Sequence, residues 1–352
     1  MMHKQLNRSL YIDLLRVLGV VAVVLIHIDS PLMNRNWGRN QGYWWIGNVV
    51  MSLLRFAVPV FVMISGATLL TREIKTSDFY RRRFLRVVLP LLFWLPAYWL
   101  FRWFMLSSPA RPTEFDEVVN WAFGLFVTEG VSKHLWYMYM IVVLYALMPL
   151  MAGLLKKIDE RGVLVLLGVW LFYLSLQQAG LVSVDFLDAG LRKVYNYLLY
   201  IGYLLTGYYL VRYMPCVKIR LSILMLVFVL TVLLSAIVSY WLSMESGRQD
   251  TVIMGSLGAN SFVQAVAVFL ICRKITIKSV FFNRIILWMS ELSFGVYFIH
   301  IMVISLFYRI GVFWTMAHPV LSVPLVLIMV LMVSFSLIYA LKKIPFLNKF
   351  IG

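Results

Sequence analysis

The sequence is poor in cysteine and poor in charge. Its two cysteines, Cys216 and Cys272, are too few for a disulfide framework and lack the spacing of a metal site, so no metal is expected. Charged residues make up only 13% of the chain, against about 25% in a soluble domain, and 62% is hydrophobic. A water-soluble globule has nowhere to bury so much apolar surface. These proportions exclude a soluble enzyme and predict an integral membrane protein.

Acidic residues are also scarce, with 15 Asp and Glu against 32 Lys and Arg, which gives a formal net charge of +17. Such an excess can serve either nucleic acid or an anionic membrane surface. The basic residues lie in short segments between apolar runs and not on one exposed face. Nucleic acid is therefore not an expected partner, whereas membrane lipid is.

Ten apolar runs are long enough to cross a bilayer. A span needs about 20 mostly apolar residues, and backbone groups in lipid must be paired within their own segment, so each run should be a helix. The sequence thus predicts an all-α polytopic protein with about ten transmembrane helices, in which residues 1–352 form a single membrane domain without a separate soluble domain. The runs cover residues 10–28, 44–70, 84–106, 134–153, 162–178, 195–213, 221–243, 254–273, 285–312 and 319–341.

Lys and Arg are biased to one side of the predicted membrane. The N-terminal segment and every second loop after it hold roughly three times as many as the loops between them. Because cytoplasmic loops carry the positive excess, both termini are expected in the cytoplasm. Asp13 and Arg16 interrupt the first apolar run, and no signal-peptide cleavage site follows it, so this run is expected to remain as the first helix.

Ionisable residues inside predicted spans are candidates for function, because each costs several kcal/mol in lipid unless it faces a polar cavity. In the first span, Asp13, Arg16 and His27 fall on one helix face. His27 is expected toward the outer leaflet and the other two toward the cytoplasm. A neutral histidine can take a proton from a hydroxyl as a general base. The alternative is a buried histidine hydrogen-bonded to a neighbouring helix.

A cluster of arginines opens the third predicted span. Arg82 and Arg83 stand four and three positions before Arg86, so on a helix their side chains can converge and donate hydrogen bonds to phosphate oxygens. The same cluster could instead anchor the chain to anionic lipid head groups. The sequence therefore leaves a phosphate site and a membrane anchor as two explanations.

Four further residues are candidates for a site on the outer side that would bind an acceptor molecule with a hydroxyl group, such as a sugar. His134 is expected at the outer surface, where it could orient a sugar stacked on Trp136, although an interfacial aromatic belt explains the tryptophan equally well. Arg55 and His300 are ionisable residues within spans. The longest outer loop, about residues 107–133, either covers an acceptor cavity or is an inert connector.

Five motifs follow one another from the first predicted helix to the ninth. They are Ile12 to Arg16 with His27, residues 58–66 (VPVFVMISG), Arg81 to Arg86 leading to Pro90, His134 to Tyr137 with Tyr145 and Pro149, and residues 292–297 (LSFGVY) with His300. In this order they resemble the membrane-bound acyltransferase family 3, which includes O-acetyltransferases of bacterial surface polysaccharides. Phe294 departs from the pattern, since a tyrosine is common there in the family.

The resemblance implies a ten-helix acyltransferase of the bacterial inner membrane. It would move an acyl group, expected to be acetyl, from cytoplasmic acetyl-CoA or another acyl-CoA to a hydroxyl on the outer side. The implied acceptor is a surface polysaccharide or its lipid-linked precursor. His27 would be catalytic, as base or as acyl-carrying nucleophile, together with Asp13 and Arg16. Arg83 and Arg86, with Arg82 beside them, would bind the phosphates of coenzyme A.

Two other classes of function fit the same residues. A proton-coupled transporter or glycan exporter would use Asp13, Glu291 and His300 as a proton relay. Glu291, His300 and Arg309 follow at nine-residue intervals, half a turn apart each time, so they cannot all face one cavity. A non-enzymatic scaffold of a glycan-assembly complex would leave His27 without a role.

Overall fold

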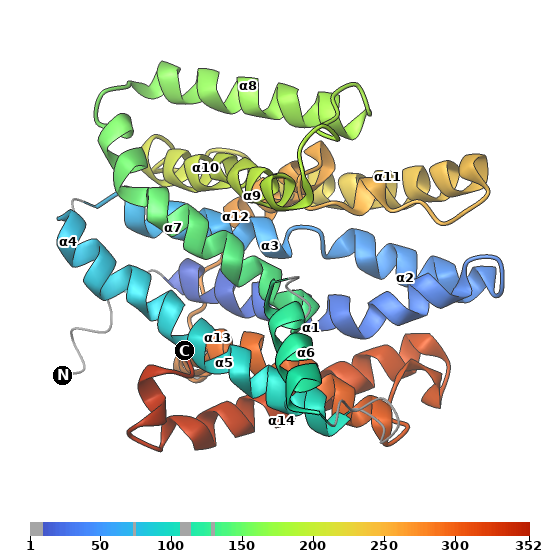
Figure 1. Ribbon diagram of the computed structural model, residues 1–352. Helices are drawn as coiled ribbons and strands as arrows, with labels where there is room; N and C mark the ends of the chain where they lie inside the picture. The colour runs from blue at the N-terminus through green and yellow to red at the C-terminus, as the bar shows by residue number, and fades with distance from the viewer. Residues whose placement is uncertain (1–9, 73–74, 106–113, 128–130) are drawn as a thin grey trace.

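The computed structural model describes residues 10–72, 75–105, 114–127 and 131–352, and within these ranges the chain is helical with no β-strand (Figure 1). Nine helical stretches in this described part are long and apolar enough to cross a membrane. This confirms the prediction of an all-α polytopic membrane protein. The stretches are Leu10–Asn36, Gln41–Leu70, Thr76–Met105, Lys133–Leu155, Glu160–Gln178, Leu221–Ser246, Val252–Lys274, Val280–Met316 and Pro319–Lys342.

Five of the stretches are divided into shorter elements. Most of the divisions are short π-helical or 3-10 turns, which shift the direction of the side chains that follow. The elements are α2 (Gln41–Leu53), α3 (Ala57–Ser65) and η2 (Gly66–Leu70); α4 (Thr76–Phe79), η3 (Tyr80–Phe84) and α5 (Leu85–Met105); η5 (Lys133–Leu135) and α7 (Trp136–Leu155); η6 (Val252–Met254) and α12 (Ala259–Lys274); and α13 (Val280–Arg309) and η7 (Trp314–Met316).

The other stretches are single helices, and a short turn follows the last of them. They are α1 (Leu10–Asn36), α8 (Glu160–Gln178), α11 (Leu221–Ser246), α14 (Pro319–Lys342) and the turn η8 (Leu347–Lys349).

The predicted span at 195–213 differs from the other nine. It forms two shorter helices, α9 (Ala189–Leu199) and α10 (Ile201–Arg212), which meet at Tyr200. The side chain of Asp188 caps α9 by accepting hydrogen bonds from two backbone amides. The α10 helix is buried along most of its length. Packing inside the bundle therefore replaces the continuous apolar length that a lone membrane span would need.

The predicted outer loop at 107–133 contains a helix of its own, α6 (Phe115–Val127), with acidic residues in its first turn. The Trp121 ring packs against Trp99 and Trp103 of α5, with ring centroids 5.6 and 5.8 Å apart. The helix is thus fixed against the bundle. Residues 107–113 and 128–130 of this loop lie outside the described part of the chain.

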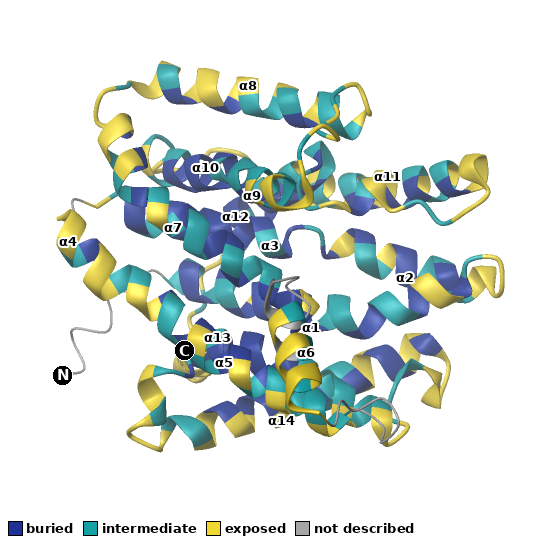
Figure 2. Ribbon diagram, in the orientation of Figure 1, coloured by how far each residue is buried: buried dark blue, intermediate teal, exposed yellow. Residues whose placement is uncertain are grey.

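The helix α1 lies in the middle of the bundle and packs against α2, α3, α13 and α14. Figure 2 shows the buried positions concentrated in α1, α3 and α12, and many exposed positions on α8 and α11. The exposed positions of α8 and α11 are largely apolar, among them Phe172 and Leu230, as expected for faces that meet lipid acyl chains. Polar groups on α1 are therefore shielded from lipid by other helices.

Two glycines allow α3 and η2 to approach α10 closely. A Cβ atom on Gly66 would overlap the backbone carbonyl of Leu204, and one on Gly207 would overlap the carbonyl of Met63. Small residues allow such backbone contact between membrane helices. This close approach gives the glycine of the Ile64-Ser65-Gly66 motif a structural reason.

Gly66→Ala is expected to destabilise the fold by about 2 kcal/mol or more, because the added methyl group meets backbone and not a movable side chain. Gly153→Ala in α7 is the matched control, since a Cβ atom there would meet none of the described residues within 4 Å. The melting temperature of each variant is measured in detergent, with size-exclusion chromatography of heated samples to monitor unfolding. Equal melting temperatures for the two variants would contradict the close approach of η2 and α10.

Candidate functional site

A cavity of about 860 Å³ opens at the end of the bundle that carries η3. This volume falls within the about 300–1,000 Å³ typical of small-molecule sites. Its walls come from α1, α3, η2, η3, α5, α7, α13 and the C-terminal segment. We call it the basic pocket, because five arginines border it: Arg16, Arg81, Arg82, Arg83 and Arg86.

The arginine cluster is presented by η3 and the first turn of α5. Arg82, Arg83 and Arg86 all border the basic pocket, with Arg83 half-buried and the other two exposed. The Arg82 Nε lies 3.9 Å from Asp78 Oδ1 in a loose surface pair. The structure thus brings together the three arginines that the sequence singled out. Their binding to phosphate stays a prediction.

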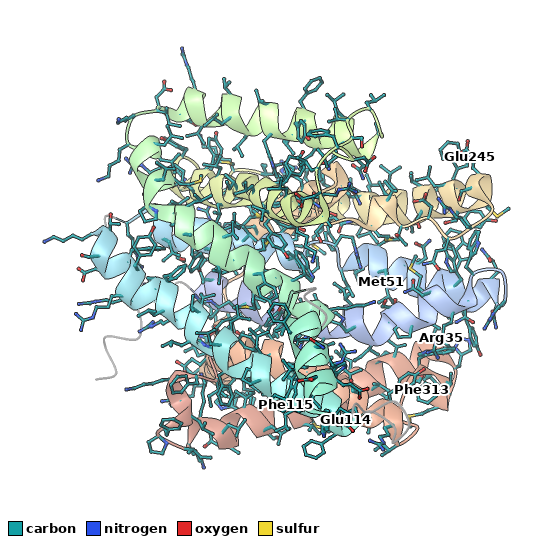
Figure 3. The ribbon with its side chains drawn as sticks, viewed as in Figure 1. Arg35, Met51, Glu114, Phe115, Glu245 and Phe313 are labelled. Atoms are coloured by element: carbon teal, nitrogen blue, oxygen red, sulfur yellow. The ribbon has the colours of Figure 1, made fainter. Side chains whose placement is uncertain are left out.

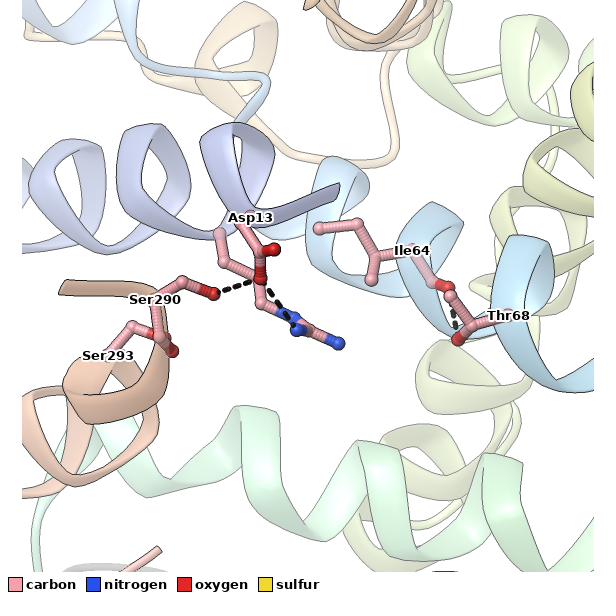
Figure 4. A network of polar contacts seen from close by, with 6 residues as sticks. Asp13, Ile64, Thr68, Ser290 and Ser293 are labelled. Atoms are coloured by element: carbon pink, nitrogen blue, oxygen red, sulfur yellow. Dashed lines mark hydrogen bonds and ion pairs between the residues drawn. The ribbon is translucent and has the colours of Figure 1, made fainter. Parts of the chain in front are cut away.

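Asp13 holds Arg16 at the inner wall of the basic pocket. Its carboxylate is 0% exposed. Asp13 Oδ1 accepts a hydrogen bond of 2.6 Å from Ser290 Oγ on α13, and Figure 4 shows these two residues facing each other. Arg16 Nη1 lies 3.3 Å from the same oxygen. Because one carboxylate connects α13 to the arginine, the guanidinium has a fixed position beside the pocket.

A layer of three histidines lies deeper in the bundle, one each from α1, η5 and α13. The ring centroid of His27 lies 5.2 Å from that of His300 and 6.2 Å from that of His134. The ring centroids of His134 and His300 are 5.1 Å apart. His134 Nδ1 pairs with Ser132 Oγ at 2.7 Å, and His300 Nδ1 lies 3.2 Å from the Val296 carbonyl. We call these three residues the histidine cluster.

The buried position of His134 corrects the expectation that it lies at the outer surface. Its side chain is only 3% exposed. The turn η5 carries it beneath α13, where the Tyr297 hydroxyl donates a hydrogen bond to the His134 carbonyl. Its position at the start of a span suggested the surface, but this turn points inward.

Two tyrosines lie between the basic pocket and the histidine cluster. Tyr137 and Tyr297 both border the pocket, and their ring centroids are 5.4 Å apart. On its other side, the Tyr297 ring lies 5.4 Å from His134 and 5.9 Å from His300. The pocket therefore ends one aromatic layer away from the histidines.

His27 borders a second, much smaller cavity toward the η7 end of the bundle. This aromatic cleft lies between α1, α13, η7 and α14 and has a volume of about 20 Å³, room for about one water molecule. Tyr308 and Phe313 stack there with ring centroids 4.5 Å apart, and Arg35 Nη1 donates to the Tyr308 hydroxyl. Figure 3 shows Arg35 and Phe313 at the same end of the bundle. The buried Nε1 of Trp314 has no hydrogen-bond partner among the residues that the structure describes.

Arg55 and Trp136 border neither the basic pocket nor the aromatic cleft. Arg55 Nε donates to the Met51 carbonyl at 2.7 Å, and its Nη1 donates to the Met254 carbonyl at 2.6 Å, so it fastens α2 to η6. The Trp136 ring packs 5.8 Å from that of Tyr200. Of the four predicted acceptor residues, His134 and His300 lie with their rings against His27, and Arg55 lies near enough to His27 to interact with it electrostatically.

The ionisable residues of α13 occupy different places, as their spacing predicts. Glu291 borders the basic pocket, His300 belongs to the histidine cluster, and Arg309 is exposed in the last turn of α13. A direct relay from Asp13 through Glu291 to His300 has no common cavity among those described. No group of three His, Cys, Asp or Glu suited to a metal ion occurs among the described residues.

The sequence reasoning missed several residues that border or support the site. Ser290 comes directly before Glu291 and carries no motif of its own. Tyr308, Phe313 and Trp314 resemble an interfacial aromatic belt in sequence, and only their contact with α1 separates them from one.

One comparison with known proteins identifies the family. The family model described as an acyltransferase domain matches residues 9–339. No curated protein and no solved structure matches the chain. The match covers nearly the whole sequence, including every motif described above and the nine spanning stretches of the described residues, except the last three residues of α14. The chain therefore belongs to the membrane-bound acyltransferase family 3 and is a membrane acyltransferase.

Proposed function

We propose that the protein transfers an acyl group, acetyl in the first instance, from cytoplasmic acyl-CoA to a hydroxyl of a surface polysaccharide or its lipid-linked precursor. The observation that carries this proposal is the order of three features along the bundle: the basic pocket, the histidine cluster and the aromatic cleft. The order offers a donor site at one end, a base or nucleophile in the middle and an approach for the acceptor at the other end.

The basic pocket suits the donor because coenzyme A carries three phosphate groups at one end and a thioester at the other. Arginine binds phosphate through several fixed donors, and five arginines border this pocket. With the phosphates near η3, the extended pantetheine arm would run toward Tyr137 and Tyr297. The thioester would then approach the histidine cluster.

His27 suits the chemical step because it alone of the three histidines borders the aromatic cleft. As a general base, it would take the proton of the acceptor hydroxyl while the oxygen attacks the thioester carbonyl and the coenzyme A thiolate leaves. As a nucleophile, its ring nitrogen would first displace the thiolate, and the acylated ring would give up a proton. The acceptor oxygen would then take the acyl group as the bond from acyl carbon to nitrogen breaks, and the ring would take the hydroxyl proton. In both routes the thiolate leaves into the basic pocket and takes up a proton.

The acceptor would approach through the aromatic cleft. Tyrosine, phenylalanine and tryptophan faces suit the apolar faces of sugar rings, and the Trp314 Nε1 is a donor with no acceptor in the described part of the chain. At its present volume the cleft does not admit a sugar. The segment around η7 would therefore open for the acceptor, as substrate-admitting loops do.

The positive-inside bias would place the η3 end in the cytoplasm, where acyl-CoA is available. The aromatic cleft would then face the outside of a bacterial inner membrane. Both termini would be cytoplasmic under this orientation.

The direct test uses radiolabelled acetyl-CoA. Binding and hydrolysis of this ligand are measured with the purified protein, and transfer of the label to glycan is measured in membranes. The proposal expects acetyl-CoA binding and acceptor-dependent transfer. If no acyl-CoA binds, and proteoliposomes carrying the protein move a solute without acyl-CoA, the transporter alternative replaces it.

Asp13→Asn is expected to weaken acetyl-CoA binding about tenfold, because Arg16 loses the carboxylate that fixes it beside the pocket. The matched control is Asp185→Asn, which breaks a surface pair with Arg192 whose atoms lie 3.1 Å apart. Equilibrium binding of labelled acetyl-CoA compares the two. If both variants bind like the wild type, Asp13 does not position the donor site.

A further inference from the structure

The C-terminal segment, residues 346–352, turns back into the bundle after α14. Ile351 is 0% exposed, and its amide donates a 3.1 Å hydrogen bond to the Leu347 carbonyl of η8. The Phe350 ring lies 6.3 Å from that of Phe93 on α5. The segment is therefore anchored to α5 and α14 by packed side chains, and it belongs to the fold.

A glycine in α13 makes this anchoring possible. A Cβ atom on Gly295 would lie 3.1 Å from the Ile351 carbonyl oxygen and 2.7 Å from a methyl carbon of Ile338. The backbone of Gly352 sits against Phe294 next to it. The glycine of the Leu292 to Tyr297 motif thus leaves room for the C-terminal segment.

The same segment borders the basic pocket. Asn348, Lys349 and Gly352 are among its lining residues, together with Ser293 and Phe294 of α13. Asn348 and Lys349 are exposed, whereas Ile351 beneath them is buried. The segment is therefore a wall of the pocket, with its buried anchor on one side and its polar residues at the mouth.

We propose that this wall completes the donor site and that Lys349 binds the 3′-phosphate of acyl-CoA at the pocket mouth. The assignment rests on the proposed function. The 3′-phosphate stands at the nucleotide end of coenzyme A, far from the thioester. If the thioester points inward to the histidine cluster, this phosphate stays near the mouth, where Lys349 is exposed. Arg16 and Arg83, which are less exposed, would meet the groups further in.

The test compares Lys349→Gln with Lys343→Gln in the full-length protein. Lys343 is also exposed and lies close by in the chain, but it rests over the Tyr339 ring at 4.7 Å and does not border the pocket. Equilibrium binding is measured for acetyl-CoA and for 3′-dephospho-acetyl-CoA. Lys349→Gln is expected to weaken the binding of acetyl-CoA about fivefold, since a single exposed charge pair is worth about 1 kcal/mol. The binding of 3′-dephospho-acetyl-CoA is expected to stay unchanged. Lys343→Gln is expected to change neither.

Two results would overturn the assignment. The first is that the Lys349→Gln variant binds both ligands as tightly as the wild type does. The second is that this variant loses the same factor in affinity for both ligands. Failure of the proposed function is distinguishable, because the wild type itself would then bind neither ligand. Ile351→Ala tests the wall separately, and it is expected to weaken both ligands alike by loosening the anchor; unchanged binding would show that the segment is not part of the site.

Discussion

His27→Ala is expected to lower acyl transfer about a thousandfold or more while acetyl-CoA binding stays within about twofold of the wild type. General base catalysis contributes about 10²–10⁴ in rate, and loss of a nucleophile costs at least as much. Binding should persist because His27 borders the aromatic cleft and not the basic pocket. Transfer of label from acetyl-CoA to glycan, beside equilibrium binding of the same ligand, separates the two effects.

The matched control is His318→Ala, at an exposed histidine before α14 whose ring lies 5.4 Å from Tyr43. It should transfer as the wild type does. Substantial transfer by the His27→Ala protein would remove this residue from the mechanism. Rapid denaturation in cold detergent at neutral pH, before the acceptor is added, separates the two routes, because an acyl-imidazole is lost in acid. Labelled protein in the wild type that is absent from His27→Ala indicates the acyl-histidine, whereas no label in either favours direct transfer.

Combined Arg83→Ala and Arg86→Ala substitutions are expected to weaken acetyl-CoA binding about a hundredfold or more. Hydrogen bonds to a charged group contribute about 1.5–3 kcal/mol each, and both side chains border the same pocket. Wild-type binding should also weaken as salt is raised, and less so in the double variant, because two phosphate contacts are gone. Filter binding over a series of salt concentrations measures both effects.

Exposed arginines on the same predicted side of the membrane provide the control. Arg220 precedes α11 and Arg284 lies near the start of α13, and neither borders the basic pocket. If Arg220→Ala with Arg284→Ala weakens binding as strongly, the arginines act only as a general positive surface. That outcome would favour the membrane-anchor explanation of the Arg81 to Arg86 cluster.

Much of the fold follows from the sequence because lipid permits few structures. Apolar runs of span length must be helices, so nine of the ten predicted runs correspond to helical stretches long enough to cross the membrane. The exception, residues 195–213, depends on tertiary packing: α10 is sheltered by α3 and α8, and the bend at Tyr200 has no signal in hydropathy.

The sequence predicts only those parts of the site in which the residues belong to one segment of the chain. Asp13, Arg16 and His27 share a helix, and the arginines lie close together between Arg81 and Arg86, so spacing alone could group them. The meeting of His27 with His134 and His300 involves segments more than a hundred residues apart, and nothing local records it. The same is true of the hydrogen bond from Ser290 to Asp13 and of the C-terminal wall of the basic pocket. Both result from the packing of helices.

The separation of the basic pocket from the aromatic cleft has a consequence for the cell. Among the described residues, the two cavities share no lining residue, and the Tyr297 ring at the basic pocket lies against His134 and His300 of the histidine cluster. A continuous water column there would leak protons and dissipate the gradient that the membrane maintains. Under the proposed function, this arrangement would let an acyl group pass from the donor side to the acceptor side while the membrane stays impermeable to ions.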